Sequence, residues 1–439
     1  MTAPGYRACR FGYDRNVRPE PSMHVLLRSL ALAGLLLTTA TLVHAQDSGA
    51  LIMALVRKGI LTDQEAEDIR AELLREAAVV PAPAFAGGKT TQRLSVGMRL
   101  QAQYAHLDTD LAAGLIDPAA TNHAFLRRVY FSLRAGLVGD WAAVMTYDFA
   151  SGGYDDALLE WKPRPDLVFN FGLRKVNTAF EERSTSGNIR SLERSSVTRY
   201  FVESNNGRRL AAAGYRIGAF VEGRLGNSGV FYNAAITNPE KVDTFSGASS
   251  AGDATTNRPA LWAGVGYGKS VPGLAWSTGV GVAHVPDQGG WGTTNAGRGF
   301  DLSLYSAFFE LTAERYTLMA EFLQADVERG VSATRDAQPR GYFLQPSVFV
   351  TETFEVVARY AALDTDGRGV TLGDVIRSAP TGATMNRSSE WYAGFNLYLK
   401  GNDLKYQLGL VSAKTKDQVN GGAAEAKTTG VRSQLQVQF

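Results

Sequence analysis

The last nine residues of the chain alternate strictly between two faces. Val431, Leu435, Val437 and Phe439 fall on one side of an extended strand, and Arg432 and three glutamines fall on the other, because successive side chains of a β-strand point in opposite directions. Two environments produce such a pattern. The apolar side either packs in a core with the polar side in water, or it contacts lipid with the polar side in a lumen.

The same alternation recurs upstream in segments of about ten to fifteen residues that are bounded by turn residues. We expect sixteen strands, at 93–107, 123–138, 141–150, 154–162, 167–176, 208–225, 229–237, 259–270, 273–285, 299–313, 315–327, 340–351, 353–363, 388–400, 403–415 and 428–439. An even number suits a closed antiparallel barrel. The predicted fold class is therefore all-β, a 16-stranded antiparallel transmembrane β-barrel over residues 93–439.

The connections between these segments favour lipid over a soluble core. Tight turns such as Gly139-Asp140 and Gly401-Asn402 mostly alternate with long polar loops, and only 151–153 breaks the rule. Outer-membrane barrels have short periplasmic turns and longer external loops, whereas a soluble β-sandwich has no reason to keep its long loops at one end. A soluble β-rich surface module is the alternative. Such a protein would be extracted from cells without detergent.

The amino-terminal region has the features of an export signal. The apolar run 31–43 follows Arg28 and ends at Val43-His44-Ala45, a small-residue cleavage pattern. We assign residues 1–45 to a signal peptide, with an overlong start and Met23 as the expected true start. This run is the only long apolar one, which excludes a helical-bundle membrane protein. Cys9, the single cysteine, lies within residues 1–45, so neither a disulfide framework nor a thiolate metal site is expected in the mature chain.

Residues 46–80 are predicted to form a periplasmic helical stub, and residues 81–92 a linker. Apolar residues recur at three- and four-residue spacing between Leu51 and Ala78, and Thr62-Asp63-Gln64-Glu65 has the pattern of a capping box. The stub is either a solvated spacer or a coiled-coil segment for self-association.

Strand parity predicts a basic lumen. In segment 123–138, Arg128 and Arg134 oppose Val129 and Phe131, and placing either arginine against lipid at mid-depth would cost about 2 to 4 kcal/mol. The same parity turns inward Arg93, Arg99, Lys162, Arg174, Arg216, Arg224, Arg359, Lys405 and Arg432. The inward acids are fewer, namely Asp148, Glu160, Glu222, Glu321 and Glu355. This excess predicts an anion-attracting channel; the alternative is a set of lumen ion pairs that stiffen the wall.

An ordered series of motifs resembles a known family. The motifs are Gly97-Met98-Arg99-Leu100-Gln101-Ala102-Gln103-Tyr104, Phe125-Leu126-Arg127-Arg128-Val129-Tyr130, Gly139-Asp140-Trp141, Tyr147-Asp148-Phe149, Gly153-Tyr154-Asp155-Asp156-Ala157, Leu192-Glu193-Arg194-Ser195 and Gly394-Phe395-Asn396-Leu397-Tyr398-Leu399. In order and spacing they resemble the phosphate-selective porin O and P family. The resemblance implies a sixteen-stranded barrel, homotrimeric assembly and anion transport across the outer membrane.

The resemblance also implies roles for single residues. It places Arg99, Arg127, Arg128 and Tyr130 in the wall along the anion path, and Asp155, Thr185, Ser186 and Arg194 near a constriction. In sixteen-stranded porins a long third external loop narrows the channel, and residues 177–207 form the longest connection here. Guanidinium groups present fixed forks to phosphate oxygens. Arg127 has outward parity in a regular strand, so its role requires a strand end or a bulge.

The chain departs from the family pattern in its cations. It has 11 Lys against 34 Arg, and Asn170 and Gly187 stand where phosphate-selecting members carry lysine. The third loop itself contains Arg183, Arg190, Arg194 and Arg199 balanced by Glu181, Glu182, Glu193 and Glu203. The sequence thus also allows an ion-paired constriction with a modest anion preference.

The predicted function is an outer-membrane porin for small anions, with phosphate or polyphosphate as candidates. The alternatives are a general, weakly selective diffusion porin and an outer-membrane barrel hydrolase that uses His106 or His123. An energised transporter is disfavoured, because no plug-sized segment precedes Arg93. We expect no enzyme activity, cofactor, metal or nucleic-acid partner. Phe439, a terminal aromatic, fits the signal that the barrel-assembly machinery recognises.

Overall fold

The computed structural model describes residues 91–439 except 113–116, 118, 204–208, 240–257, 292–298, 372–383 and 418–424, together with residues 55, 56, 58, 62 and 66. The chain divides into two compact units, Met1–Gln46 and Asp47–Phe439, and the described residues all belong to the second. The expected signal peptide lies outside the described residues, as do nearly all of the helical stub and most of the linker. No helix in the described part is long and apolar enough to cross a membrane.

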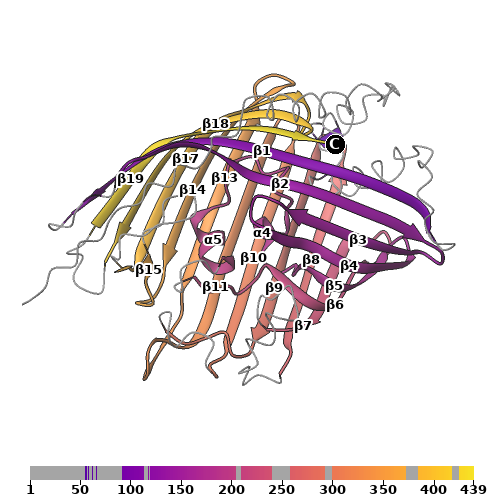
Figure 1. Cartoon of the computed structure of the whole chain (residues 1–439), viewed down its shortest axis with the longest axis horizontal. Helices are drawn as coiled ribbons and strands as arrows, with labels where there is room; N and C mark the ends of the chain where they lie inside the picture. Colours follow the sequence, from indigo (N-terminus) through magenta and orange to yellow (C-terminus); the bar gives the residue numbers. More distant parts are fainter. Residues whose placement is uncertain are drawn as a thin grey trace, which may run out of the picture. The chain divides into compact units, whose positions relative to one another are not determined.

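Sixteen long antiparallel strands form the wall over the described residues, each paired with the next in the chain. They are β1 (Thr91–Leu111), β2 (Thr121–Leu137), β3 (Trp141–Asp148), β4 (Gly153–Arg164), β5 (Leu167–Lys175), β6 (Tyr215–Arg224), β7 (Val230–Thr237), β8 (Ala260–Val271), β9 (Leu274–Val285), β10 (Leu302–Ala313), β11 (Tyr316–Ser332), β13 (Arg340–Phe349), β14 (Phe354–Asp364), β17 (Arg387–Lys400), β18 (Leu404–Lys416) and β19 (Glu425–Gln438). β1 also pairs with β19, from Arg99 opposite Gln438 to Leu111 opposite Ala426, which closes the barrel (Figure 1).

Each of the sixteen expected segments corresponds to one wall strand, so the predicted closed barrel is confirmed. The largest error is at β6, which begins at Tyr215 and not at 208. Leu210 and Ala212 donate their backbone N–H groups to the carbonyls of Tyr200 and Phe201. This stretch belongs to the third loop, because its hydrogen bonds go to the loop and not to a neighbouring strand.

Two short features were not expected from the sequence. β11 continues past the wall to Ser332 and turns into β12 (Arg335–Ala337). In the connection between β14 and β17, β15 (Val370–Thr371) pairs with β16 (Thr384–Met385). Strands of two or three residues carry too little alternation to be distinguished from loop sequence.

The two faces of the wall have the burial of a membrane barrel. On β19, Leu435 and Val437 are 47% and 41% exposed, whereas Gln434 and Gln436 are 1% and 0% exposed. A strand of a soluble protein buries its apolar side, and here the polar side is the buried one. The alternation at the carboxy-terminus therefore corresponds to lipid outside and polar contacts within.

The third loop, residues 176–214, lies inside the ring of strands. It contains α4 (Phe180–Arg183) and α5 (Ser196–Val202), which Figure 1 shows within the barrel. Ser195 caps α5, because its hydroxyl accepts a hydrogen bond from the Thr198 N–H at 3.0 Å. α5 contacts β11, β13 and β14, and its Val197 and Phe201 join an apolar cluster with inward residues of these strands.

The register at the closure of the barrel requires a glycine. A Cβ on Gly430 would lie 2.0 Å from the His106 carbonyl oxygen and 2.8 Å from the Leu107 Cα. Gly430→Val should therefore destabilise the folded barrel by about 1 to 3 kcal/mol, seen as a lower urea midpoint in detergent. Gly226→Asn, at a turn with φ of 51° and open space, is the matched control. Equal midpoints for the two variants would contradict this account of closure.

Candidate functional site

A β-bulge brings two consecutive arginines to the inside of the wall. Between β1 and β2, Gln101 lies opposite Arg128 and Ala102 opposite Leu126, so Arg127 is the extra residue. Arg127 donates to both carboxylate oxygens of Glu193, at 2.5 and 2.9 Å, and Arg128 donates to the Gln101 side-chain oxygen at 2.8 Å. In a regular strand the Arg127 side chain would point outward. The bulge turns it inward.

Glu193 is the point where the third loop is held to this part of the wall. It is buried, and besides Arg127 it accepts a hydrogen bond from Gln103 of β1 at 3.1 Å. Burial alone would raise the pKa of the Glu193 carboxyl, but the charges of Arg127 and Arg128 hold that pKa well below its ordinary value. The carboxylate therefore stays ionised through the physiological range.

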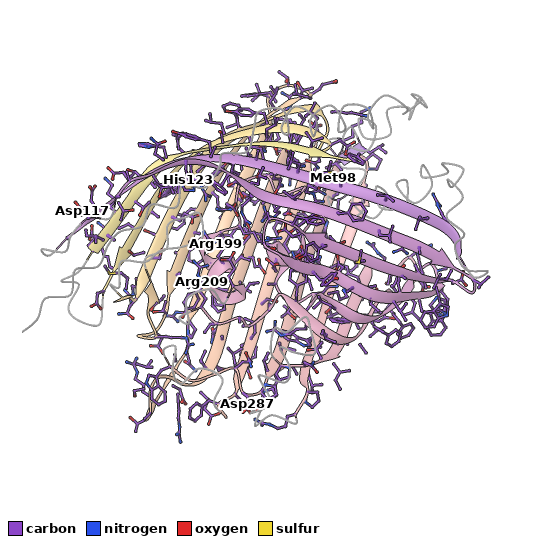
Figure 2. The ribbon with its side chains drawn as sticks, in the orientation of Figure 1. Met98, Asp117, His123, Arg199, Arg209 and Asp287 are labelled. Atoms are coloured by element: carbon purple, nitrogen blue, oxygen red, sulfur yellow. The ribbon has the colours of Figure 1, made fainter. Side chains whose placement is uncertain are left out.

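A second set of ion pairs ties the loop to β14. Arg359 of β14 lies 3.4 Å from the Glu181 carboxylate and donates to Ser191 at 2.7 Å, and Arg190 pairs with Glu355 at 2.8 Å. The expected balance of arginines and glutamates within the loop is only partly internal. Arg194–Glu182 and Arg199–Glu203 join loop residues, while Glu181, Arg190 and Glu193 pair with the wall. Figure 2 shows Arg199, which belongs to α5, and Arg209 within the ring of strands.

Glutamines of the closing strands bind the loop backbone. Gln101 donates to the Ser186 carbonyl at 3.1 Å and Gln436 to the Gly187 carbonyl at 3.0 Å, and Gln407 reaches the Arg190 carbonyl at 3.1 Å. Backbone groups of an irregular loop need such partners when they are buried. The loop thus occupies the lumen beside β1 and β14 to β19.

The remaining lumen beside β2 to β7 contains a cavity of about 600 Å³ next to the β3–β4 connection. Its lining includes nine of the sequence-predicted residues, namely Arg99, Arg127, Arg128, Tyr130, Asp155, Arg174, Thr185, Ser186 and Arg194. Seven cationic side chains and five carboxylates line it. Strands and loop contribute together, so the sequence-predicted wall and constriction residues do meet at one place.

A second cavity of about 550 Å³ lies toward the short turns. Its lining includes four of the expected cations, Arg134, Lys162, Arg174 and Arg224. Glu160 pairs with Arg134, and Glu222 pairs with Arg174. The two cavities share Asp156, Arg174, Asn177 and Arg183 in their linings. These four side chains therefore lie where the two spaces approach each other.

Five other expected lumen residues line neither cavity. Arg216 is buried and donates to the carbonyls of Pro239 and Tyr215 at 3.0 and 2.8 Å, and Lys405 donates to the Ile189 carbonyl at 3.2 Å. Arg359 and Arg432 are buried, and Arg93 is half-buried at the start of β1. Parity predicts the face of a side chain, but it does not predict that a loop covers that face.

Arg183 of α4 was missed as a single site residue. Its guanidinium carbon lies 4.8, 5.2 and 5.8 Å from the ring centres of Phe180, Phe308 and Phe231, a geometry that suits cation–π attraction. Lys175, at the end of β5, was also missed; it pairs with Glu182 at 2.9 Å. Periodicity assigns no direction to Arg183, a loop residue, so the arginine content of the loop was the only available signal for it. Lys175 was missed for another reason, because strict alternation places it on the outer face with Phe171 and Leu173.

His284 has a hydroxyl group and a carboxylate near its imidazole ring. His284 lies 3.5 Å from the Ser303 hydroxyl and 3.5 Å from the Asp301 carboxylate, which is long for hydrogen bonds. Asp301 is already bound by Arg258 at 2.6 and 3.0 Å. His106 and His123 are exposed. The described residues contain no group of three or more His, Cys, Asp or Glu side chains that could hold a metal ion.

The Glu193 anchor gives a testable prediction. Glu193→Gln leaves two buried arginines without their carboxylate and should weaken loop attachment by roughly 3 kcal/mol, seen as larger open-channel current noise. Glu203→Gln is the matched control, because its bonds to Arg199 and Arg209 lie within the loop. Since the folded-state pKa of Glu193 is lowered, the anchor of the native channel should weaken only as the pH falls through that lowered value. Noise that rises near pH 5 would contradict this.

Gly187 is packed where a side chain would displace Arg99. An added Cβ would lie 2.8 Å from the Arg99 guanidinium and 2.6 Å from the Gln438 side-chain oxygen. Gly187→Ala should therefore move Arg99 off Ser186 and change single-channel conductance, with little loss of thermal stability because flexible side chains give way. Gly136→Ala, whose Cβ would make only ordinary contacts, should leave conductance unchanged. An unaltered conductance in Gly187→Ala would show that Arg99 does not border the path.

The comparisons with known proteins agree with this geometry. A sequence model described as phosphate-selective porin O and P matches residues 95–439. Among solved structures, an anion-selective porin from Comamonas acidovorans has 14% identity and a TM-score of 0.51, over 79% of this chain and 99% of that one. The outer membrane channel DcaP of Acinetobacter baumannii has 13% identity and a TM-score of 0.51, over 80% of this chain and 99% of that one.

A search of curated proteins finds no match. At such identities the solved structures show the shared fold alone, whereas the sequence model covers most of the chain, including nearly all of β1 and every later wall strand. The chain therefore belongs to the phosphate-selective porin O and P family and is an outer-membrane porin.

Proposed function

We propose that this porin passes small anions, phosphate among them, through the two arginine-lined cavities and past the third loop. The observation that carries the proposal is the charge around the larger cavity, where seven cationic side chains face five carboxylates. A cationic excess inside low-dielectric walls raises the local concentration of anions. The porin of similar fold from Comamonas acidovorans is anion-selective, which points the same way.

The proposed path depends on Arg174 and Arg183, which border both cavities. Arg174 comes from the wall and is paired with Glu222, whereas Arg183 comes from α4 and lies against aromatic rings. A permeating anion would pass between a wall cation and a loop cation. Conduction requires weak binding at several sites, and partly neutralised arginines suit that requirement better than one deep site.

A general, weakly selective porin is the second candidate. The pairs Arg134–Glu160, Arg174–Glu222 and Lys175–Glu182 neutralise much of the cationic lining. In this account the pairs keep the lumen open and wet, and the anion preference is small. Reversal potentials under a salt gradient separate the two candidates, and phosphate competing with chloride in single-channel recordings tests the preferred anion.

We also propose that the porin acts as a homotrimer in the Gram-negative outer membrane. β3 and β7 have eight residues each, and a tilted strand of that length spans roughly 20 Å, less than the apolar band of about 25 Å. Trp141 and Trp161 stack on the outer side of β3 and β4 with ring centres 5.6 Å apart. A low wall with large aromatics suits contact with other copies of the chain.

The amino-terminal segments and the carboxy-terminus would serve export and assembly of the porin. Residues 1–45 would direct export and be removed, and residues 46–80 would form a periplasmic stub joined by the linker 81–92 to the barrel at 93–439. The stub would help copies to associate. The barrel-assembly machinery would recognise Phe439 and the alternation that precedes it.

Removing the loop cation tests the pore path directly. Arg183→Gln keeps a polar side chain of similar reach and should lower the anion-to-cation permeability ratio by about threefold or more, because a charge is lost where the cavities approach. Arg335→Gln, an exposed arginine that pairs with Asp366 in a loop, is the control and should leave the ratio unchanged. An Arg183→Gln channel with the native ratio would place the path elsewhere.

A further inference from the structure

A row of charged residues crosses the outer face of the wall at its long-loop end. The strand register places Arg340 of β13 beside Asp364 of β14, Asp364 beside Arg387 of β17, Arg387 beside Lys416 of β18, and Lys416 beside Glu425 of β19. This row lies at the opposite end of the strands from the short turns. In an outer-membrane barrel that end is external, so the row lies at the level of the outer leaflet headgroups.

Like charges are placed opposite each other in this region. Arg387 is in register with Lys416, and Lys414 is in register with Lys427 of β19. Like charges directly opposite on neighbouring strands repel. Glu425 pairs with both Lys414 and Lys416, Asp364 pairs with Arg387, and Asp110 of β1 is in register with Lys427. Three carboxylates therefore face these four cations, and Arg340 adds a fifth cation. This excess of positive charge attracts anions from outside the protein.

Aromatic side chains lie directly below the charged row on the same outer face. The strand register places Phe322 of β11 beside Tyr342 of β13, and Tyr360 of β14 beside Trp391 of β17. Trp391 is 60% and Tyr342 is 48% exposed, and the rings of Tyr360 and Trp391 are 4.6 Å apart. Aromatic residues of this kind gather at the membrane interface. They mark the depth at which headgroups give way to acyl chains.

A groove of about 550 Å³ joins the two layers. Its lining includes Arg340, Arg387, Lys414 and Lys416 together with Tyr342 and Tyr360. It is separate from the two lumen cavities and shares no lining residue with them. One end of the groove thus offers guanidinium and ammonium groups, and the other offers apolar ring faces.

We propose that this groove binds a phosphorylated lipid of the outer leaflet. The lipid phosphates would lie against Arg387, Lys414 and Lys416, and an acyl chain would follow Tyr342 and Tyr360 toward the bilayer centre. Charge complementarity selects an anionic headgroup, and the register of cations above aromatics selects a ligand with an apolar tail. A soluble anion would use only the upper half of the groove.

The test is native mass spectrometry of the full mature chain in detergent with a diphosphorylated, acylated glucosamine disaccharide. The native porin should retain this lipid, and Lys414→Ala/Lys416→Ala should bind it about tenfold more weakly, since each surface cation contributes to anionic-lipid attraction. Arg315→Ala/Lys400→Ala removes two exposed cations near the opposite end of the same strands and should leave binding unchanged. Equal loss in both double variants would overturn the proposal.

Two further experiments distinguish lipid binding from the effects of misfolding and from the binding of free phosphate. Glu425→Gln frees Lys414 and Lys416 from their carboxylate and should tighten lipid binding severalfold, a gain that a misfolded protein cannot mimic. The dephosphorylated lipid should not be retained, and inorganic phosphate at the same concentration should not displace the phosphorylated one. Retention of the dephosphorylated lipid, displacement by inorganic phosphate, or weaker binding by Glu425→Gln would each contradict the assignment.

Discussion

The buried contact between Glu193 and the arginine pair Arg127–Arg128 is the interaction on which the interior of this porin depends. A barrel of sixteen strands encloses more space than its own side chains fill, so something else must shape the lumen. The third loop does so here, and a loop inside a barrel needs partners for its backbone and charges. Glu193 supplies one anchor on β2, while Glu181 and Arg190 supply others on β14.

These anchors divide the lumen into two unequal parts. Beside β1 and β14 to β19, inward glutamines and Arg359 are used to hold the loop. Beside β2 to β7, the inward cations other than Arg216 border open cavities. The same kind of inward residue therefore holds the loop on one side and borders open space on the other. A charge count over all inward positions would miss this difference.

Much of the barrel could be predicted because strand geometry is local. Alternation of period two marks each wall strand, and the parity of Arg128 and Arg134 is determined by the cost of placing arginine in lipid. The residues near the constriction were predicted only through the family resemblance, and Thr185, Ser186 and Arg194 do share a cavity with Arg99 and Arg128. Arg183 was missed because no periodicity applies to a loop that contacts side chains far away in the sequence.

The sequence by itself determined the sixteen strands, their two faces and the end at which the long loops lie, since these depend on neighbouring residues and on the cost of charge in lipid. The tertiary structure decided which inward cations border open space. Arg216, Arg359 and Lys405 satisfy buried loop or backbone groups, whereas Arg127 faces inward only through a bulge. That choice depends on contacts between residues such as Arg127 and Glu193, 66 positions apart, which local alternation does not encode.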